Sequence, residues 1–338
     1  MQLTRLDVRL TWLDPDRLDE LDVAAAVAVR EAARQVDAPH ALGDIVSSYT
    51  ARLRHGFDGE PPLVTLARDG RGAPVGTVSV SLPHWDNTHL GSVVVTVDPR
   101  FRRCGLGRRL FEVGRDRVRA DGRTVLLGYG VDSPALTGFA TAMGMEPAFT
   151  IAHRRQDLRA ADRALLDREY AAAQARAEGY ELVRLAGTTP EDLLPAVVAM
   201  TTAINDAPTD NLDVEDEVFS PERIRAYESA QLARGDRFYR LVVRSRDTGE
   251  LAGHTVVTVD RERPWWGHQH DTSVVAAHRG HRLGVLLKAG MLRWLAEREP
   301  QVHTIDTTNA VSNAHMIRVN ELLGYRLVAT ATEWQRRL

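Results

Sequence analysis

The chain has 338 residues, which at about 150 residues per domain favours two domains. Its composition, 43% hydrophobic and 26% charged, is typical of a globular protein and not of a disordered or fibrous one. A net charge of −3 argues against a dedicated nucleic-acid binder, and no apolar stretch is long enough to span a membrane. The single cysteine, Cys104, excludes an intrachain disulfide and a cysteine-based zinc site.

The first residues alternate between polar and apolar side chains, so we expect no signal peptide and a cytoplasmic location. Lysine is nearly absent from the composition. Of the 43 basic residues only Lys288 is a lysine, and the rest are arginine. Codon bias in a GC-rich genome accounts for the excess of arginine, but it does not explain why one lysine remains.

In chain order, the first half predicts a strand at 3–10, helices at 18–35 and 42–55, and strands at 63–68, 74–82 and 91–97. Asp69-Gly70-Arg71-Gly72 between two of these strands is a hairpin signal. There follow a helix at 106–120, a strand at 124–127, a helix at 134–143 and a final strand. This order predicts a mixed α/β (α+β) fold, because strands and helices do not alternate strictly as in a doubly wound sheet.

The second half of the chain repeats this order of elements. Three matches have nearly the same offset: Gly107 with Gly284 at 284 − 107 = 177, Gly144 with Gly324 at 324 − 144 = 180, and Leu3 with Leu182 at 182 − 3 = 179. Chance similarity between loops would not keep the offset constant. We therefore expect two domains, at 1–157 and 179–338, joined by a connecting helix at 158–178.

The most informative segment is a loop between a buried strand and a helix. In Arg102-Arg103-Cys104-Gly105-Leu106-Gly107 the glycines allow a tight turn, and successive backbone N–H groups point outward at a helix N-terminus. Flanking arginines add bonds to phosphate oxygens, so a pyrophosphate is the expected ligand. The motif is not a Walker A loop, and it is not a Rossmann fingerprint because Leu110 stands at the third glycine.

With this strand, loop and helix and a downstream Asn…Leu-Gly-Tyr segment, the chain resembles the GNAT superfamily of acyltransferases over nearly its whole length, as two tandem domains. The resemblance implies that acetyl-CoA is the co-substrate and that its pantetheine arm pairs with the fourth strand. An amine attacks the thioester, a base accepts its proton, and the thiolate leaves. The residues implied in binding acetyl-CoA are Val95, Val97, Arg102, Arg103, Cys104, Gly105, Gly107, Arg108, Val274, Val275, Arg279, Gly280, His281, Arg282, Gly284, Lys288, Asn309, Asn313 and Met316.

The loop of the second copy departs from the family pattern, because Arg282 stands where the motif has glycine. A non-glycine residue there must avoid positive φ. We therefore expect either a loop of different shape or a direct contact between Arg282 and phosphate. Lys288, one turn into the next helix, shares a helix face with Gly284, so its ammonium is expected to reach back toward the phosphates.

The downstream segment favours the second copy as the catalytic one. It keeps Asn313 and the Leu-Gly-Tyr sequence, but Asn320 replaces the tyrosine that in the family commonly protonates the leaving thiolate. The first copy has Ser133, Ala140 and Met145 at the corresponding places. The first copy thus has the better phosphate loop and the poorer catalytic segment.

Two histidines are candidates for the base. His268 and His270 share one face of the predicted fourth strand of the second copy, where either imidazole can accept a proton near neutral pH. The first copy offers only His89 in this region. Proton transfer through water, without a dedicated base, is the alternative in both copies.

An acidic loop that includes Asp206, Asp210 and Asp213 is expected to form the rim of the acceptor site and to attract a cationic amine. The expected partner is a small-molecule amine, with no nucleic acid and no membrane, in a monomer or homodimer. No His-x-x-x-His spacing occurs on a predicted helix, so no metal site is expected. Two rivals stay open: a non-catalytic acyl-CoA-binding or scaffold protein, and catalysis by the first copy.

Overall fold

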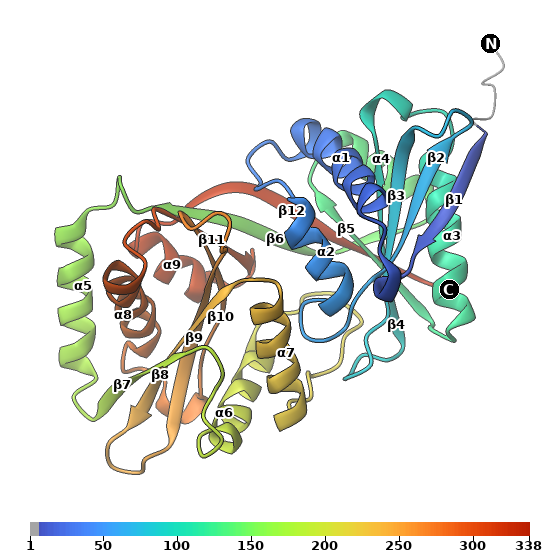
Figure 1. The fold of residues 1–338 in the computed structure, drawn as a ribbon. Coiled ribbons are helices and arrows are strands. Elements are labelled where there is room, and N and C mark those ends of the chain that lie inside the picture. Colours follow the sequence, from blue (N-terminus) through green and yellow to red (C-terminus); the bar gives the residue numbers. More distant parts are fainter. Residues whose placement is uncertain (1–6) are drawn as a thin grey trace. The chain divides into compact units, whose positions relative to one another are not determined.

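The computed structural model describes residues 7–338, and their packing forms two compact units (Figure 1). Unit 1 contains the chain up to Thr150 together with 210–215 and 329–338, and unit 2 contains 151–209 and 216–328. These units do not follow the predicted domain boundaries at 157 and 179, because each unit contains segments from both sides of them. Where each repeat begins and ends stays a prediction. The match at Leu3 and the first part of the predicted strand at 3–10 lie outside the described residues.

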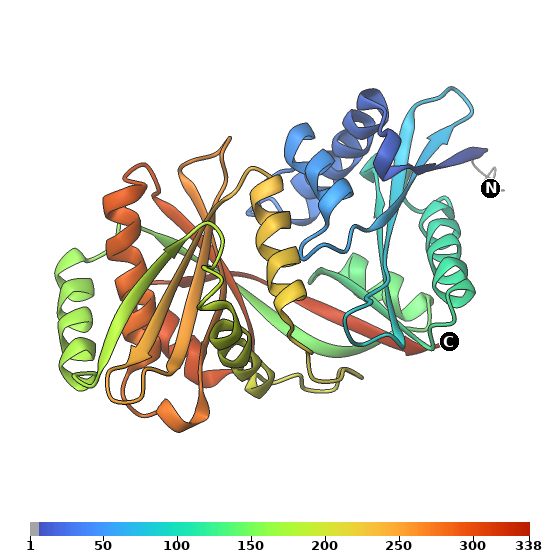
Figure 2. The ribbon, with the colours of Figure 1, turned by 60° about the horizontal axis from the view of Figure 1, so that its bottom comes forward.

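Unit 1 is a mixed sheet with helices on both faces. Its strands in spatial order are β1 (Val8–Leu13), β2 (Leu63–Asp69), β3 (Pro74–Ser81), β4 (Leu90–Val97), β5 (Val125–Val131) and β12 (Arg326–Arg337). Only the β4–β5 pair is parallel. One face carries α1 (Glu20–Asp37) and α2 (Val46–His55), and the other carries α3 (Leu106–Ala120) and α4 (Pro134–Ala142) (Figure 2). The 3-10 turns are η1 (Pro15–Arg17) and η2 (Pro99–Phe101).

Unit 2 has the same plan. Its strands in spatial order are β6 (Glu146–Asp157), β11 (Thr304–Ala310), β10 (Trp266–Val274), β9 (Leu251–Val259), β8 (Arg237–Ser245) and β7 (Tyr180–Ala186). Only the β10–β11 pair is parallel. One face carries α6 (Leu194–Thr201) and α7 (Pro221–Ala233), and the other carries α5 (Arg163–Arg176), α8 (Leu283–Arg298) and α9 (Ala314–Leu322). The 3-10 turns are η3 (Thr202–Asp206) and η4 (Ala276–His278).

Local chemistry explains where these elements begin and how deeply they lie. The Asp19 carboxylate accepts hydrogen bonds from the N–H groups of Leu21 and Asp22 (2.8 and 3.1 Å) and so starts α1. Ser133 and Asn313 cap α4 and α9 in the same way. All nine residues of β9 are buried, as befits a strand covered on both faces. Within residues 7–338, no helix combines the length and apolar character needed to cross a membrane.

Each unit takes a strand from the other repeat. β6 is the last strand of the first repeat, but its Ile151–Asp157 segment pairs antiparallel with β11 of unit 2. β12 ends the second repeat, but its Ala331–Arg337 segment pairs antiparallel with β5 of unit 1, and Trp334 packs into the core of that unit. The sequence pattern predicted the final strands but not this exchange, because a strand's periodicity does not identify its neighbour.

We expect Trp334→Ala to lower the free energy of unfolding of unit 1 by about 3–5 kcal/mol, because it removes a large buried side chain and leaves a cavity. Leu327→Ala is the matched control, since Leu327 lies on the same strand but is 54% exposed. Its effect should stay within about 0.5 kcal/mol. Urea unfolding followed by circular dichroism measures both, and equal losses would contradict the strand exchange.

Candidate active site

The Arg/Gly loops of the two repeats have the same backbone shape. In the first loop Arg103 and Gly105 have φ of +64° and +86°, and in the second Gly280 and Arg282 have φ of +88° and +58°. The expectation that Arg282 must avoid positive φ is therefore wrong. A left-handed conformation costs a non-glycine residue about 1–2 kcal/mol. An ion pair between Arg282 and Glu169 of α5 (2.6 Å) holds the side chain in place.

An arginine side chain braces each loop. Nε of Arg102 and Nε of Arg279 each donate to the main-chain carbonyl five residues earlier (3.2 and 3.1 Å). Arg102 also pairs with Asp37 at the end of α1 (2.5 Å), and Arg279 pairs with Asp206 at the end of η3. Both loops are thus tied to the first helical segment of their own repeat, and a carboxylate already balances each guanidinium.

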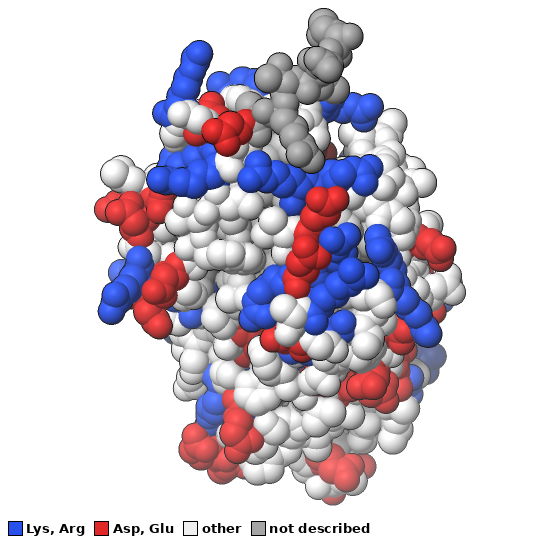
Figure 3. All heavy atoms as spheres, turned by 90° about the vertical axis from the view of Figure 1, so that its right-hand side faces the viewer, with Lys and Arg blue, Asp and Glu red and all other residues white. Residues whose placement is uncertain are grey.

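Both loops lead into a helix N-terminus that suits an anion. Among the described residues, neither α3 nor α8 has a side-chain cap, so their first-turn N–H groups can bond to phosphate oxygens. Arg103 and Arg108 are exposed at the start of α3, and Figure 3 shows basic side chains gathered on the face of unit 1 that carries α3 and β1. The other loop residues take up local contacts: the Cys104 thiol donates to the carbonyl of Phe101, and the ring of His281 packs against Tyr180.

The parallel strands β10 and β11 separate in unit 2. Their pairing ends at His268 and Asp306, whereas both strands continue for several residues. A β-bulge between Gln269 and Thr272 interrupts the β9–β10 pairing at the same level. In unit 1, β4 separates from β5 after Ser92, but the β3–β4 pairing is regular. The residues expected to pair with pantetheine lie on or directly after the separated segments: Val95, Val97, Val274 and Val275.

The bulge is accompanied by polar side chains on the α6/α7 face. Nδ1 of His270 lies 2.7 Å from the Tyr227 hydroxyl of α7, and Nε2 lies 3.0 Å from Oγ1 of Thr258 on β9. Burial lowers the pKa of His270 to about 3 and also lowers the pKa of His268. Both imidazoles are therefore neutral near pH 7. Removal of the Asp271 carboxyl group from water raises its pKa, and its charge acts on Tyr227.

A buried ion pair lies beneath this face. Arg240 of β8 and Glu228 of α7 are 1% and 0% exposed, and their side chains meet at 2.8 Å. The Thr189 hydroxyl donates to Glu228 (2.5 Å) and accepts from Arg240 (2.6 Å). Burial, helped by the positive charge of Arg240, lowers the pKa of His254 on β9 to about 3. A buried, hydrogen-bonded ion pair and a neutral histidine thus lie together on β8, β9 and α7.

On the opposite face of the sheet, α9 meets the separated part of β11. Nδ2 of Asn320 donates to Oδ1 of Asn309 on β11 (2.5 Å), and Asn320 is fully buried. Asn313 caps α9 by accepting from the N–H of Met316 (3.0 Å). The structure therefore joins Asn309 to Asn320 and Asn313 to Met316, and three of these four predicted residues cap or belong to α9.

Lys288 lies on a buried side of α8. It is 2% exposed, and its ammonium is 4.8 Å from the centre of the Tyr325 ring. Burial lowers the pKa of Lys288 to about 7. The side chain is therefore inside unit 2 and in contact with an aromatic ring, and the expected contact with phosphate stays a prediction.

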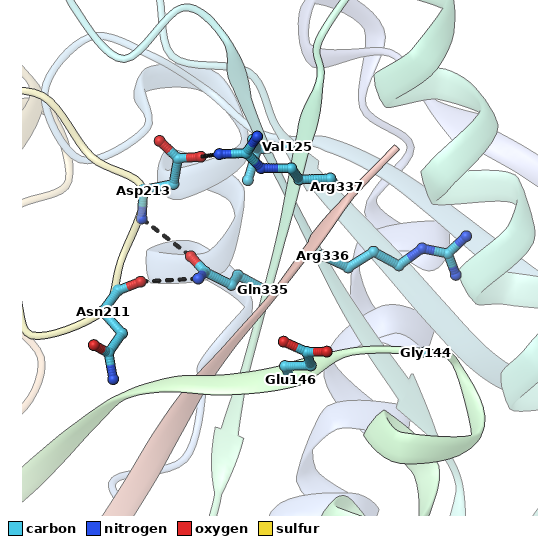
Figure 4. A pocket seen from close by; sticks show the side chains of 8 residues that line it. All are labelled: Val125, Gly144, Glu146, Asn211, Asp213, Gln335, Arg336 and Arg337. Atoms are coloured by element: carbon cyan, nitrogen blue, oxygen red, sulfur yellow. Dashed lines mark hydrogen bonds and ion pairs between the residues drawn. The ribbon is translucent and has the colours of Figure 1, made fainter.

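The three acids of the predicted rim do not fall in one unit. Asp206 belongs to unit 2, whereas Asp210 and Asp213 are packed in unit 1. There Asp213 pairs with Arg337 (3.1 Å), and its N–H donates to Oε1 of Gln335 (3.0 Å), at the edge of a pocket of about 570 Å³ (Figure 4). A role for these acids as an acceptor rim stays a prediction.

Unit 1 has no counterpart to the polar face of β10. Its β4 consists of apolar residues, glycine, serine and threonine from Leu90 to Val97. His89, just before this strand, lies 3.0 Å from the main-chain oxygen of Asp213. Among residues 7–338, no group of three or more His, Cys, Asp or Glu side chains is arranged to hold a metal ion. The two units thus share a phosphate-type loop and differ in their titratable groups.

Sequence reasoning missed Tyr227, Thr258 and Asp271. Strand periodicity places Asp271 on the face opposite His270. The bulge removes that alternation, and the Asp271 charge acts on the Tyr227 hydroxyl that bonds His270. Tyr227 has no sequence signal, because only the packing of α7 on the sheet brings it to this strand.

A profile of the acetyltransferase (GNAT) family matches residues 31–145 and 203–325. The two matches cover more than half of the chain, which therefore belongs to this family and carries two copies of its domain. The protein is an N-acetyltransferase by class, and the predicted fold and class are confirmed.

Two solved structures are similar over nearly the whole chain. A tandem GNAT protein from the clavulanic acid biosynthesis pathway, solved without AcCoA, is 26% identical over 98% of each chain, with a TM-score of 0.80. A GCN5-related N-acetyltransferase from Sphaerobacter thermophilus is 16% identical, with a TM-score of 0.68, and the similarity covers 97% of this chain and 95% of that one. The second likeness shows the fold alone. No curated protein matches the sequence.

We expect Glu228→Ala to lower the free energy of unfolding of unit 2 by about 3–5 kcal/mol, because it leaves the buried Arg240 without its counter-charge. Glu191→Ala is the matched control. Glu191 also pairs with an arginine, Arg225, but its side chain is 85% exposed. Chemical denaturation measures both variants, and a Glu228 effect as small as that of Glu191 would show that the buried pair does not support the site.

Proposed function

We propose that the protein transfers an acetyl group from acetyl-CoA to the amine of a small cationic acceptor, and that the second repeat performs the reaction. The observation that carries this proposal is the contrast between the two fourth strands. β10 combines a bulge, a separated edge and neutral histidines, whereas β4 has regular pairing with β3 and no titratable side chain.

The second loop and β10 suit the two ends of acetyl-CoA. The first-turn N–H groups of α8 and the helix dipole favour the pyrophosphate. Beyond His268, the free edge of β10 offers main-chain groups to the pantetheine amides, as an added strand would use them. The bulge between Gln269 and Thr272 leaves backbone groups outside the ladder, and an N–H there polarises the thioester carbonyl.

His268 is the base in this proposal. Burial keeps its imidazole neutral, and the carboxylate of Asp306, which is in register with it on β11, raises its pKa against that burial. His270 is a positioning residue, because Tyr227 and Thr258 engage both of its ring nitrogens. The carboxylate of Asp271, whose charge also acts on Tyr227, attracts the cationic acceptor.

A non-catalytic acyl-CoA-binding protein is the second candidate. Asn320 in the place of the family's tyrosine favours it, because a carboxamide does not donate a proton to a thiolate. Catalysis by the first repeat is the third, favoured by glycine at both motif positions of its loop, Gly105 and Gly107.

Substitution of the loop glycines separates these candidates. A Cβ at Gly284 meets no atom within 4 Å, so Gly284→Val should keep its fold and block the space at the start of α8. We expect it to abolish acetyl-CoA turnover with an amine panel, measured as free thiol. Gly107→Val is the matched variant, although a Cβ there approaches Phe139 at 3.1 Å, so its melting temperature is measured too. Loss of turnover only in the Gly107 variant would assign catalysis to the first repeat. Tight CoA binding without turnover in the wild type would favour the binding protein.

His268→Gln should lower kcat about 100-fold, because general base catalysis is typically worth 10²–10⁴-fold. Since burial lowers the pKa of His268, the wild-type rate should stay high below pH 6.5 and fall only at more acid pH. That acid limb should disappear in the variant. His84→Gln is the control, because the His84 side chain is 72% exposed. An unchanged rate and pH profile in His268→Gln would remove the histidine from the mechanism.

A further inference from the structure

Three positions in the interior of unit 2 are polar where the other repeat is apolar. They are Lys288 on α8, Asn320 on α9, and Tyr325 directly before β12. With the repeat offsets of 177 and 180, the corresponding residues of unit 1 are Phe111, Ala140 and Met145. All three of those are 5% exposed and belong to the core of unit 1. At these positions the same fold therefore packs its interior with apolar side chains alone. The polar set occurs only in the second repeat.

One atom of this polar set has no hydrogen-bond partner within residues 7–338. Oδ1 of Asn320 is buried and has no hydrogen-bond partner among the described residues. The Lys288 ammonium lies over the Tyr325 ring, and the N–H of Tyr325 donates to the main-chain oxygen of Asn320 (2.9 Å). Lys288 and Asn320 thus both contact Tyr325, and Asn320 also bonds to Asn309 on the part of β11 that has left β10.

The surroundings of Lys288 do not neutralise its charge. Burial is the cause that shifts its pKa, and no carboxylate among the described residues offsets it. Glu169 and Asp167 of α5 pair with arginines of the α8 segment, and the charge of Asp306 acts on Tyr325. A buried ammonium without a counter-charge destabilises a fold. Its presence where the other repeat has Phe111 therefore points to a role in function.

We propose that Lys288, with its ammonium placed over the Tyr325 ring, protonates the departing CoA thiolate at the opening between β10 and β11. The inference rests on the proposed acetyl transfer by the second repeat. The amine nitrogen bonds to the carbonyl carbon and its proton goes to His268. As the C–S bond breaks, the sulfur keeps the electron pair and takes a proton from Nζ, and neutral Lys288 regains a proton from solvent. Lys288 thus takes over the task of the tyrosine that Asn320 replaces.

Lys288→Met tests the role in turnover. We expect kcat to fall about 100-fold, the dissociation constant of acetyl-CoA to stay within about twofold, and the melting temperature to rise because a buried amine is removed. Phe111→Met is the matched control in unit 1 and should leave kcat unchanged. A kcat within twofold of the wild type overturns the proposal. So does weaker CoA binding at unchanged kcat, which would return Lys288 to phosphate binding.

The single lysine also allows a test on the unaltered protein, which does not depend on any variant folding. Lysine labelled with ¹³C at Cε gives one signal, whose shift with pH reports the protonation of Lys288. We expect CoA to raise this pKa, because its sulfur shares a proton with the amine, and desulfo-CoA to leave it lower. Identical titrations with both ligands overturn the proposal. A wild type that binds CoA without turning it over refutes acetyl transfer, while the titration still reports on Lys288.

Discussion

The separation of β10 from β11 beyond His268 and Asp306 is the constraint on which the second unit depends. Parallel strands that part leave a row of main-chain N–H and C=O groups without a neighbouring strand. An extended ligand with amide groups meets that need better than water can in a covered sheet. The bulge lies at the same level, so the same irregularity that opens the sheet on one side brings polar side chains to its α6/α7 face.

Most of the scaffold could be predicted, because local sequence signals define its helices, strands and loops and the second repeat shows the same signals again. The constant offset identified the two loops. An arginine at the equivalent position braces each of them, Arg102 in the first and Arg279 in the second. The conformation of Arg282 could not be predicted, because single-residue preference disfavours positive φ while the repeated framework imposes it. The exchange of β6 and β12 escaped prediction as well, since strand pairing is a long-range property that no periodicity encodes.

The site was predicted less completely than the scaffold, again for physical reasons. His268 and His270 follow from strand alternation, but Asp271 depends on a bulge that breaks it. Lys288 stood out as the single lysine of the chain. Its burial could not be predicted from the spacing of apolar residues along the helix. Ten of the sixteen residues of α8 are buried, so no single apolar stripe marks which side faces inward. In such a helix only the packing of its neighbours decides whether an ammonium meets solvent or an aromatic ring.

The exchange of β6 and β12 between the repeats also suggests how a gene with two repeats arises. A protein with one repeat and the same connection would send its last strand away from its own sheet, leaving β5 or β11 with an open edge. Two such chains could complete each other only by reciprocal exchange, as an intertwined dimer. Fusion into a single chain makes that partner permanent and present in equal amount. It also frees the two halves to diverge, one keeping an apolar interior and the other acquiring polar residues at the corresponding positions.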